Sequence, residues 1–144
     1  MSLRRISHAI DAYSRTLTAE YDVTGPQLAC LYYIRRNEPT TLSQISAGIC
    51  LSVGTVNGIL DRLKAKGLIH RRRTTKDRRK VMVRLTEQGR ALVERAPSLL
   101  HARLAGHVKK LPEFKQAAMA LSLEEIVKLM ELEQMPPSEN ENAL

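Results

Sequence analysis

The chain has 144 residues, of which 43% are apolar, so it is long enough to form one domain with its own core. Only 3% are aromatic, which predicts an aliphatic core of packed helices and leaves few side chains for stacking on single-stranded bases. The net charge of +8 lies almost entirely in residues 61–84, which hold eleven Lys or Arg and two Asp, and such a block is typical of a site for a polyanion.

The first expected element is a helix at about residues 2–20. Its apolar residues recur at 3-4-3-4 spacing and form one face: Leu3, Ile6, Ile10, Tyr13 and Leu17. Such a stripe needs a partner surface, from this chain or from a second copy. An isolated chain has few ways to cover such a stripe, so we interpret it as half of a homodimer interface.

Two capping boxes predict where the next helices begin. Thr24 with Gln27, and Thr41 with Gln44, each place a hydroxyl three residues before a Gln side chain. The helix that follows Thr41 is short. Ser52 is then expected to cap a fourth helix at about residues 52–66.

A hairpin and two helical regions complete the predicted order. The strands are expected at about residues 68–73 and 80–85, joined by a polar connection, so that the hairpin covers about 68–86. A helix from 87 to about 111 should kink at Pro97. A last helix begins after Pro112, and we prefer one long helix to a break at Ser122.

The last helix carries a second apolar stripe, which we also assign to dimerisation: Met119, Leu123, Ile126 and Met130. The polar residues 135–144 are expected to form a disordered tail. The predicted fold is therefore mostly α-helical with a small β-hairpin wing. One domain at 1–134 would hold a winged helix-turn-helix at about 24–88 between dimerisation helices at about 2–20 and 87–134.

Two consecutive helices joined by a tight turn, followed by a basic hairpin, predict binding to double-stranded DNA. The second helix of such a unit enters the major groove by its first turns, where short polar groups and glycines let the backbone lie close to DNA. The hairpin supplies cations for phosphates or a neighbouring minor groove. The predicted contact residues are Ser52, Val53, Gly54, Thr55, Asn57, Gly58, Arg62, Arg71, Arg72, Arg73, Lys76, Asp77, Arg78, Arg79 and Lys80.

The same residues resemble a known family. The helix and its turn, and then the hairpin, are similar to the recognition helix and wing of MarR-type transcription regulators: Leu51–Val56, Asp61-Arg62-Leu63, Lys66–Ile69, Asp77-Arg78-Arg79, Leu85-Thr86 and Gly89. The resemblance covers about residues 5–133. It implies a triangular homodimer, Arg79 in the minor groove oriented by Asp77, and repression relieved by a small molecule or by oxidation.

Other functions are less well supported by the residues. The chain has no nucleotide-binding loop, no His-Glu-x-x-His motif and no nucleophile elbow, so we expect neither an enzyme nor a cofactor or metal site. No secretory segment, long apolar run or Cys-x-x-Cys spacing is present, which predicts a reduced, cytoplasmic protein.

Three alternatives or additions stay open at this point. Tyr13, Tyr32 and Tyr33 are candidates for lining an effector pocket, and equally for core or interface residues. A repressor that responds to oxidation through Cys30 or Cys50 is a second hypothesis. A non-specific architectural or RNA-binding protein is a third, distinguished by equal affinity for unrelated sequences.

Overall fold

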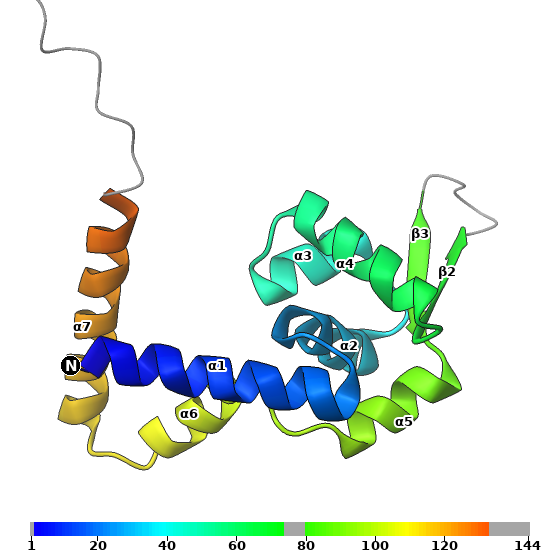
Figure 1. Cartoon of the computed structure of the whole chain (residues 1–144). Helices are drawn as coiled ribbons and strands as arrows, with labels where there is room; N and C mark the ends of the chain where they lie inside the picture. The colour runs from blue at the N-terminus through cyan, green and yellow to red at the C-terminus, as the bar shows by residue number, and fades with distance from the viewer. Residues whose placement is uncertain (1, 74–79, 133–144) are drawn as a thin grey trace, which may run out of the picture. The chain divides into compact units, whose positions relative to one another are not determined.

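The computed structural model describes residues 2–73 and 80–132, which form helices and one small sheet (Figure 1). The chain divides into two compact units, residues 1–100 and 101–144. The first unit holds α1 (Ser2–Tyr21), α2 (Gly25–Asn37), β1 (Thr40–Thr41), α3 (Leu42–Ile49), α4 (Val53–Ala65), β2 (Ile69–Arg73), β3 (Val81–Leu85) and α5 (Glu87–Arg95). The second unit holds α7 (Glu113–Leu132) and all but the first residue of α6 (Leu100–Val108).

The predicted capping boxes are confirmed. The Thr24 hydroxyl accepts a hydrogen bond from the Gln27 N–H, and the Gln27 side chain accepts one from the Thr24 N–H. Thr41 and Gln44 make the same reciprocal pair at the start of α3, and Ser52 caps α4. The first turn of a helix has N–H groups with no partner inside the helix, so these side chains fix where each helix begins.

The sheet has the strand order β1-β3-β2, with both pairs antiparallel. The hairpin register pairs Ile69 with Leu85 and Arg73 with Val81, as a wing requires. Strand β1 was not predicted, because it is only two residues long and carries no alternating pattern. Its Thr40 is buried and pairs with Val83, which attaches the wing to the start of α3.

The core of the first unit is aliphatic and gathers α2, α3 and α4 against the sheet. Leu17 belongs to this core and is 0% exposed, which corrects its assignment to the dimer interface. The reason is the turn after α1, where the Val23 N–H donates to the Leu17 carbonyl and Val23 joins Leu17 and the first residues of α2 in one core. Leu17 therefore packs within its own chain.

The prediction of a kinked helix from 87 to 111 is wrong. Helix α5 ends at Arg95, and α6 begins at Leu100. Ala96 adopts an extended conformation with ψ 146°, as the Cδ of the following Pro97 favours, so the helix stops instead of bending. The single long last helix is confirmed as α7, whereas the tail 135–144 lies outside the described residues.

Within residues 2–73 and 80–132, no single helix is long and apolar enough to cross a membrane, although α3 and α4 meet that test as a pair bent by 111°.

Candidate nucleic-acid interface

Helix α4 has a buried side and an exposed side. Its apolar residues face the core and are at most 6% exposed: Val56, Ile59, Leu60 and Leu63. The predicted contact residues occupy the other side, where all but the half-buried Gly58 are exposed: Ser52, Val53, Gly54, Thr55, Asn57, Gly58 and Arg62. The 3.6-residue period of the helix therefore separates a side that holds the fold from a side made of short, mostly polar groups.

The first turns of α4 are capped by Ser52 and contain two glycines. The Ser52 hydroxyl accepts from the Thr55 N–H at 3.1 Å and lies 2.8 Å from the Thr55 hydroxyl oxygen. A methyl group at Gly54 or Gly58 would meet no atom within 4 Å among the described residues outside the local helix backbone. Packing inside the chain thus does not require glycine at either position, whereas a close approach by DNA would.

The wing carries its basic residues in two directions. His70, Arg72, Met82 and Arg84 line a hollow on its outward face. Arg71 instead turns back to α4, where its Nη1 lies 2.8 Å from Asp61 Oδ1. The Arg71 side chain is only 19% exposed. Arg71 was predicted to face DNA with its neighbours, but in this structure it joins β2 to the recognition helix.

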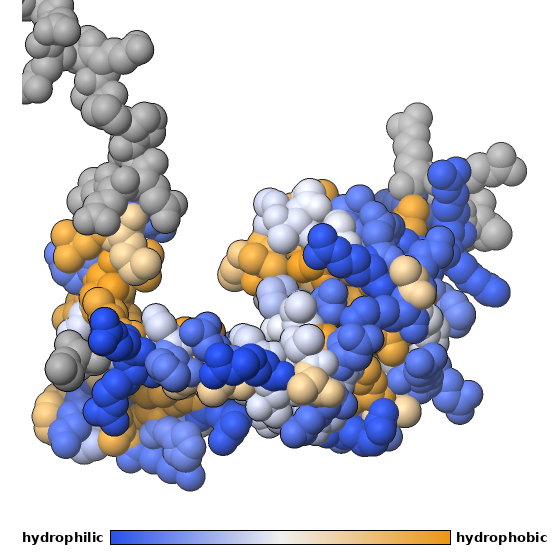
Figure 2. Space-filling model, in the orientation of Figure 1, coloured by the Kyte–Doolittle hydropathy of each residue, from blue (hydrophilic) through white to orange (hydrophobic). Residues whose placement is uncertain are grey.

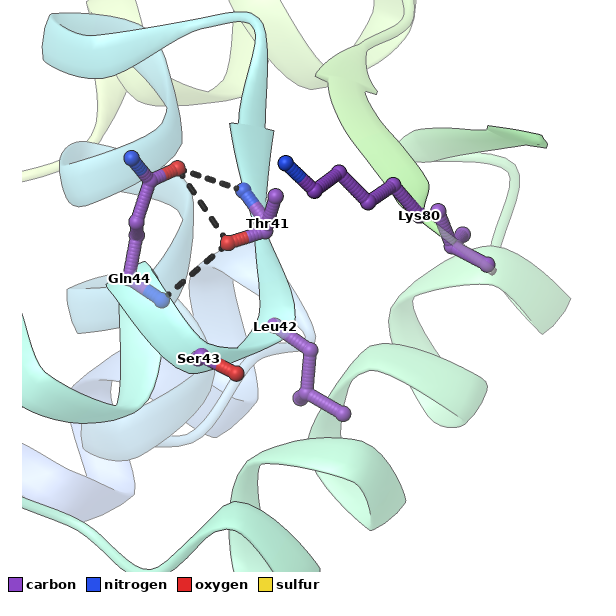
Figure 3. A pocket seen from close by; sticks show the side chains of 6 residues that line it. Thr41, Leu42, Ser43, Gln44 and Lys80 are labelled. Atoms are coloured by element: carbon purple, nitrogen blue, oxygen red, sulfur yellow. Dashed lines mark hydrogen bonds between the residues drawn. The ribbon is translucent and has the colours of Figure 1, made fainter. Parts of the chain in front are cut away.

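The rest of the predicted wing contacts lie at or beyond the described residues. Lys76, Asp77, Arg78 and Arg79 fall in residues 74–79, which are outside them, so their roles stay predictions. Arg73 and Lys80 are exposed on either side of that segment. Figure 3 shows the Lys80 side chain extending toward Thr41, and the two residues help to line a hollow at the start of α3. Lys80 thus places a cation beside the helix-turn-helix.

Glu38, which sequence reasoning missed, fixes the base of the wing. Its Oε2 accepts a hydrogen bond from the Leu85 N–H at 3.0 Å, and its Oε1 forms an ion pair with Arg90. The Glu38 side chain is only 12% exposed. One carboxylate at the end of α2 therefore holds β3 and α5. The sequence contains no local signal for it, since its partners lie 47 and 52 residues away.

Comparison with known proteins identifies this arrangement. The model of the MarR family matches residues 23–81, which include α2–α4 and β2 and end at the start of β3. The chain is 31% identical over 117 residues to the organic hydroperoxide resistance transcriptional regulator of Bacillus subtilis, covering 76% of this chain and 80% of the relative. The chain belongs to the MarR family. MarR proteins are transcription regulators and not enzymes.

Solved structures agree on the MarR fold. The DNA complex of Staphylococcus aureus MepR is similar with a TM-score of 0.69 and 26% identity, covering 88% of this chain and 93% of that chain. Bordetella bronchiseptica BpsR, whose DNA binding is regulated by 6-hydroxynicotinic acid, has a TM-score of 0.65 and 27% identity, covering 87% and 89%. Of several other curated relatives that the chain matches, it spans 49% to 64% of the length.

The residues assigned to MarR dimerisation are mostly exposed. On α1, Leu3, Ile6 and Ile10 are 62%, 51% and 47% exposed. On α7, the large apolar residues with at least 39% exposure are Phe114, Met119, Leu121, Leu123, Val127, Leu129 and Met130, and Ile126 is half-buried. Figure 2 shows apolar side chains gathered on this helix. Each unit therefore exposes an apolar helix face that folding of the described residues leaves uncovered.

Two of the three candidate effector-pocket tyrosines hold the connection between α5 and α6. The Tyr13 hydroxyl donates to the Ser98 carbonyl at 3.1 Å. The Tyr32 hydroxyl lies 3.1 Å from both the Ala96 and Pro97 carbonyls, and burial raises the Tyr32 pKa while Arg35 and Arg36 oppose that rise. Tyr33 packs its ring against Gly48. A pocket lined by all three stays a prediction.

The two thiols differ in environment. Cys30 is buried in the core, and burial raises its pKa to about 12. Cys50 is exposed at the end of α3, in a left-handed conformation that starts the turn into α4. Since the thiolate is the form that oxidants attack, Cys50 is the better placed of the two for redox chemistry. No group of three potential metal-ligating side chains occurs among residues 2–73 and 80–132.

Proposed function

We propose that this MarR protein is a homodimeric repressor that binds a palindromic operator and is released from it by a small molecule. The observation that carries the proposal is the exposed polar side of α4 beside a basic wing, in a chain with uncovered apolar faces on α1 and α7. In this proposal Arg79 enters the minor groove, and Asp77 orients the Arg79 side chain. A two-fold dimer would place its two recognition helices about one DNA turn, ~34–36 Å, apart.

Two properties of the relatives support the finer parts of this proposal. BpsR shows that DNA binding in a protein of this fold can respond to a small aromatic acid. The MepR complex shows the same fold on DNA. The tyrosine hydrogen bonds to residues 96–98 connect α1 and α2 to the segment after α5, so a ligand that broke them would alter how this segment is held.

The test is selection of bound sequences from random duplexes, with the mass of the protein in solution measured alongside. Recovery of a palindrome by a dimer supports the proposal. Tight, salt-sensitive binding without an enriched sequence would instead indicate an architectural or RNA-binding protein. A single unpaired half-site would contradict the dimeric reading.

A pair of matched variants tests the dimer itself. Changing both Ile6 and Ile10 to Asp places charges on the exposed apolar face of α1 and should give a monomer that loses the palindrome. His8→Asp adds charge on the opposite face of the same helix, because positions on α1 rotate by about 100° per residue, and should remain dimeric. A dimer that survives both Ile substitutions would remove α1 from the interface.

Release by oxidation is the second candidate, favoured by the exposed thiol of Cys50 in the turn before α4. If peroxide dissociates the protein from its operator and Cys50→Ser prevents this, the thiol is the switch. Equal release of the parent and Cys50→Ser would exclude that role, and Cys30→Ser serves as the buried control.

A further inference from the structure

Arg71 makes a second contact on α4 that no DNA-binding role of the wing explains. Besides its ion pair with Asp61, its Nη2 lies 3.3 Å from both the main-chain oxygen and the side-chain Oδ1 of Asn57. Asn57 and Asp61 are four residues apart and therefore occupy the same face of α4. One guanidinium from β2 thus holds two neighbouring side chains of the recognition helix.

The chemistry of this contact fixes the orientation of the Asn57 amide. A guanidinium carries only hydrogen-bond donors, so the atom of the amide that faces Arg71 must be the oxygen. The Asn57 Nδ2 group is then turned away from Arg71. Asn57 is exposed. Among residues 2–73 and 80–132, no group accepts a hydrogen bond from its NH2 group.

The contact is also held firmly. The Arg71 side chain is 19% exposed, and its Nη1 lies 2.8 Å from the Asp61 carboxylate. A charge-assisted hydrogen bond of that length is among the stronger ones in proteins. Asp61 therefore keeps Arg71 in place, and Arg71 in turn limits the rotation of the Asn57 side chain before any DNA is bound.

We propose that Arg71 is a positioning residue for sequence recognition: it presents the Asn57 NH2 group as a hydrogen-bond donor toward the major groove. The base pair that Asn57 reads would then be G·C, because guanine presents two adjacent acceptors, N7 and O6, to a group that only donates. Adenine is usually read by both amide atoms of Asn, and here the oxygen is already engaged. This inference rests on the proposed function, since it assigns the preference of one position in each half-site.

The experiment measures preference and not only affinity. A set of operators, each changed at one symmetric position of both half-sites to every other base pair, is titrated against the parent, Arg71→Met and Asn57→Ala. The parent should favour a G·C pair over an A·T pair by about tenfold at one position. Both variants should lose that preference at the same position, and the double variant should lose no more than either alone.

The matched control is Arg72→Met, which removes the same charge from the adjacent, exposed residue of β2. Loss of a phosphate contact should weaken binding to every sequence by one common factor and keep the preference. Asp61→Asn, which keeps Arg71 but weakens its anchor, should give a partial loss at the Asn57 position and serves where Arg71→Met does not fold.

The outcomes separate this inference from the function on which it rests. A selective parent whose preference is unchanged in Arg71→Met and Asp61→Asn overturns the positioning role alone. A preference for an A·T pair at the position lost in Asn57→Ala overturns the orientation, since adenine is read by both amide atoms of Asn. A parent that selects no sequence overturns both the inference and the proposed function.

Discussion

Gly58 offers a test that separates the stability of the recognition helix from its contact with DNA. It lies in the middle of α4, where glycine is less favourable than alanine by about 1 kcal/mol. A methyl group there would meet nothing within 4 Å among the described residues outside the local helix backbone. Gly58→Ala should therefore raise the free energy of unfolding by up to ~1 kcal/mol and raise Tm by roughly 4 °C.

The same substitution should weaken operator binding. Gly58 lies beside the exposed Asn57 in the first half of α4, where the DNA backbone or a base edge is expected to approach. An added methyl group in a close interface displaces its partner or leaves a gap, and a cost of about 1.4 kcal/mol would lower affinity tenfold. Thermal unfolding and fluorescence anisotropy with a labelled operator measure the two effects on one preparation.

Gly106 supplies the matched control. It lies inside α6, in the other unit, and a methyl group there also meets nothing within 4 Å among the described residues. Gly106→Ala should be stabilised by a similar amount and bind the operator like the parent. If Gly58→Ala is stabilised and also binds like the parent, close approach of DNA is not the reason for glycine in α4.

Three further predictions follow from the packing. Gly89→Ala should lower the free energy of unfolding by at least about 2 kcal/mol in urea titrations, because its Cβ would lie 2.1 Å from the main-chain oxygen of Leu68; a change below 0.5 kcal/mol would contradict this packing. Glu38→Ala should cost about 2–3 kcal/mol, since it strands a β3 N–H and removes an ion pair, whereas Glu38→Gln should cost less because it keeps an acceptor. At pH 8, iodoacetamide should modify Cys50 in the folded protein and Cys30 only after unfolding, because burial raises the Cys30 pKa to about 12; mass spectrometry showing equal rates would place Cys30 at the surface.

Local signals predicted the helix-turn-helix well, because they act within four residues. The Thr24–Gln27 and Thr41–Gln44 pairs form hydrogen bonds inside one helical turn, so the sequence alone determines them. The apolar–polar alternation of β3 likewise matches its burial, since Val83 and Leu85 are buried and Arg84 between them is exposed. These features set the beginning of α3 and the faces of the wing with no need for tertiary information.

Contacts between residues far apart in the sequence could not be predicted in the same way. Pro97 marked a disturbance, but the hydrogen bonds from Tyr13 and Tyr32 that hold residues 96–98 join segments 64 to 85 residues apart. Leu17 continued an apolar period that belongs to α1, yet the turn into α2 buries it in a different surface. A stripe on one helix shows that it needs partners without showing that all its members share one.

The basic block between residues 61 and 84 illustrates the same limit within the candidate site. The net charge of the block predicted contact with a polyanion, but it does not distinguish exposed cations from paired ones. In the structure, Arg71 is bonded to Asp61, and Lys66 lies 3.3 Å from the Asp22 carboxylate at the end of α1. These two cations hold β2 and α1 to the recognition helix, while Arg72 and Arg73 remain exposed. The block therefore combines two kinds of cation: exposed ones available to neutralise phosphates, and paired ones that place the recognition helix and its wing where phosphates can be reached.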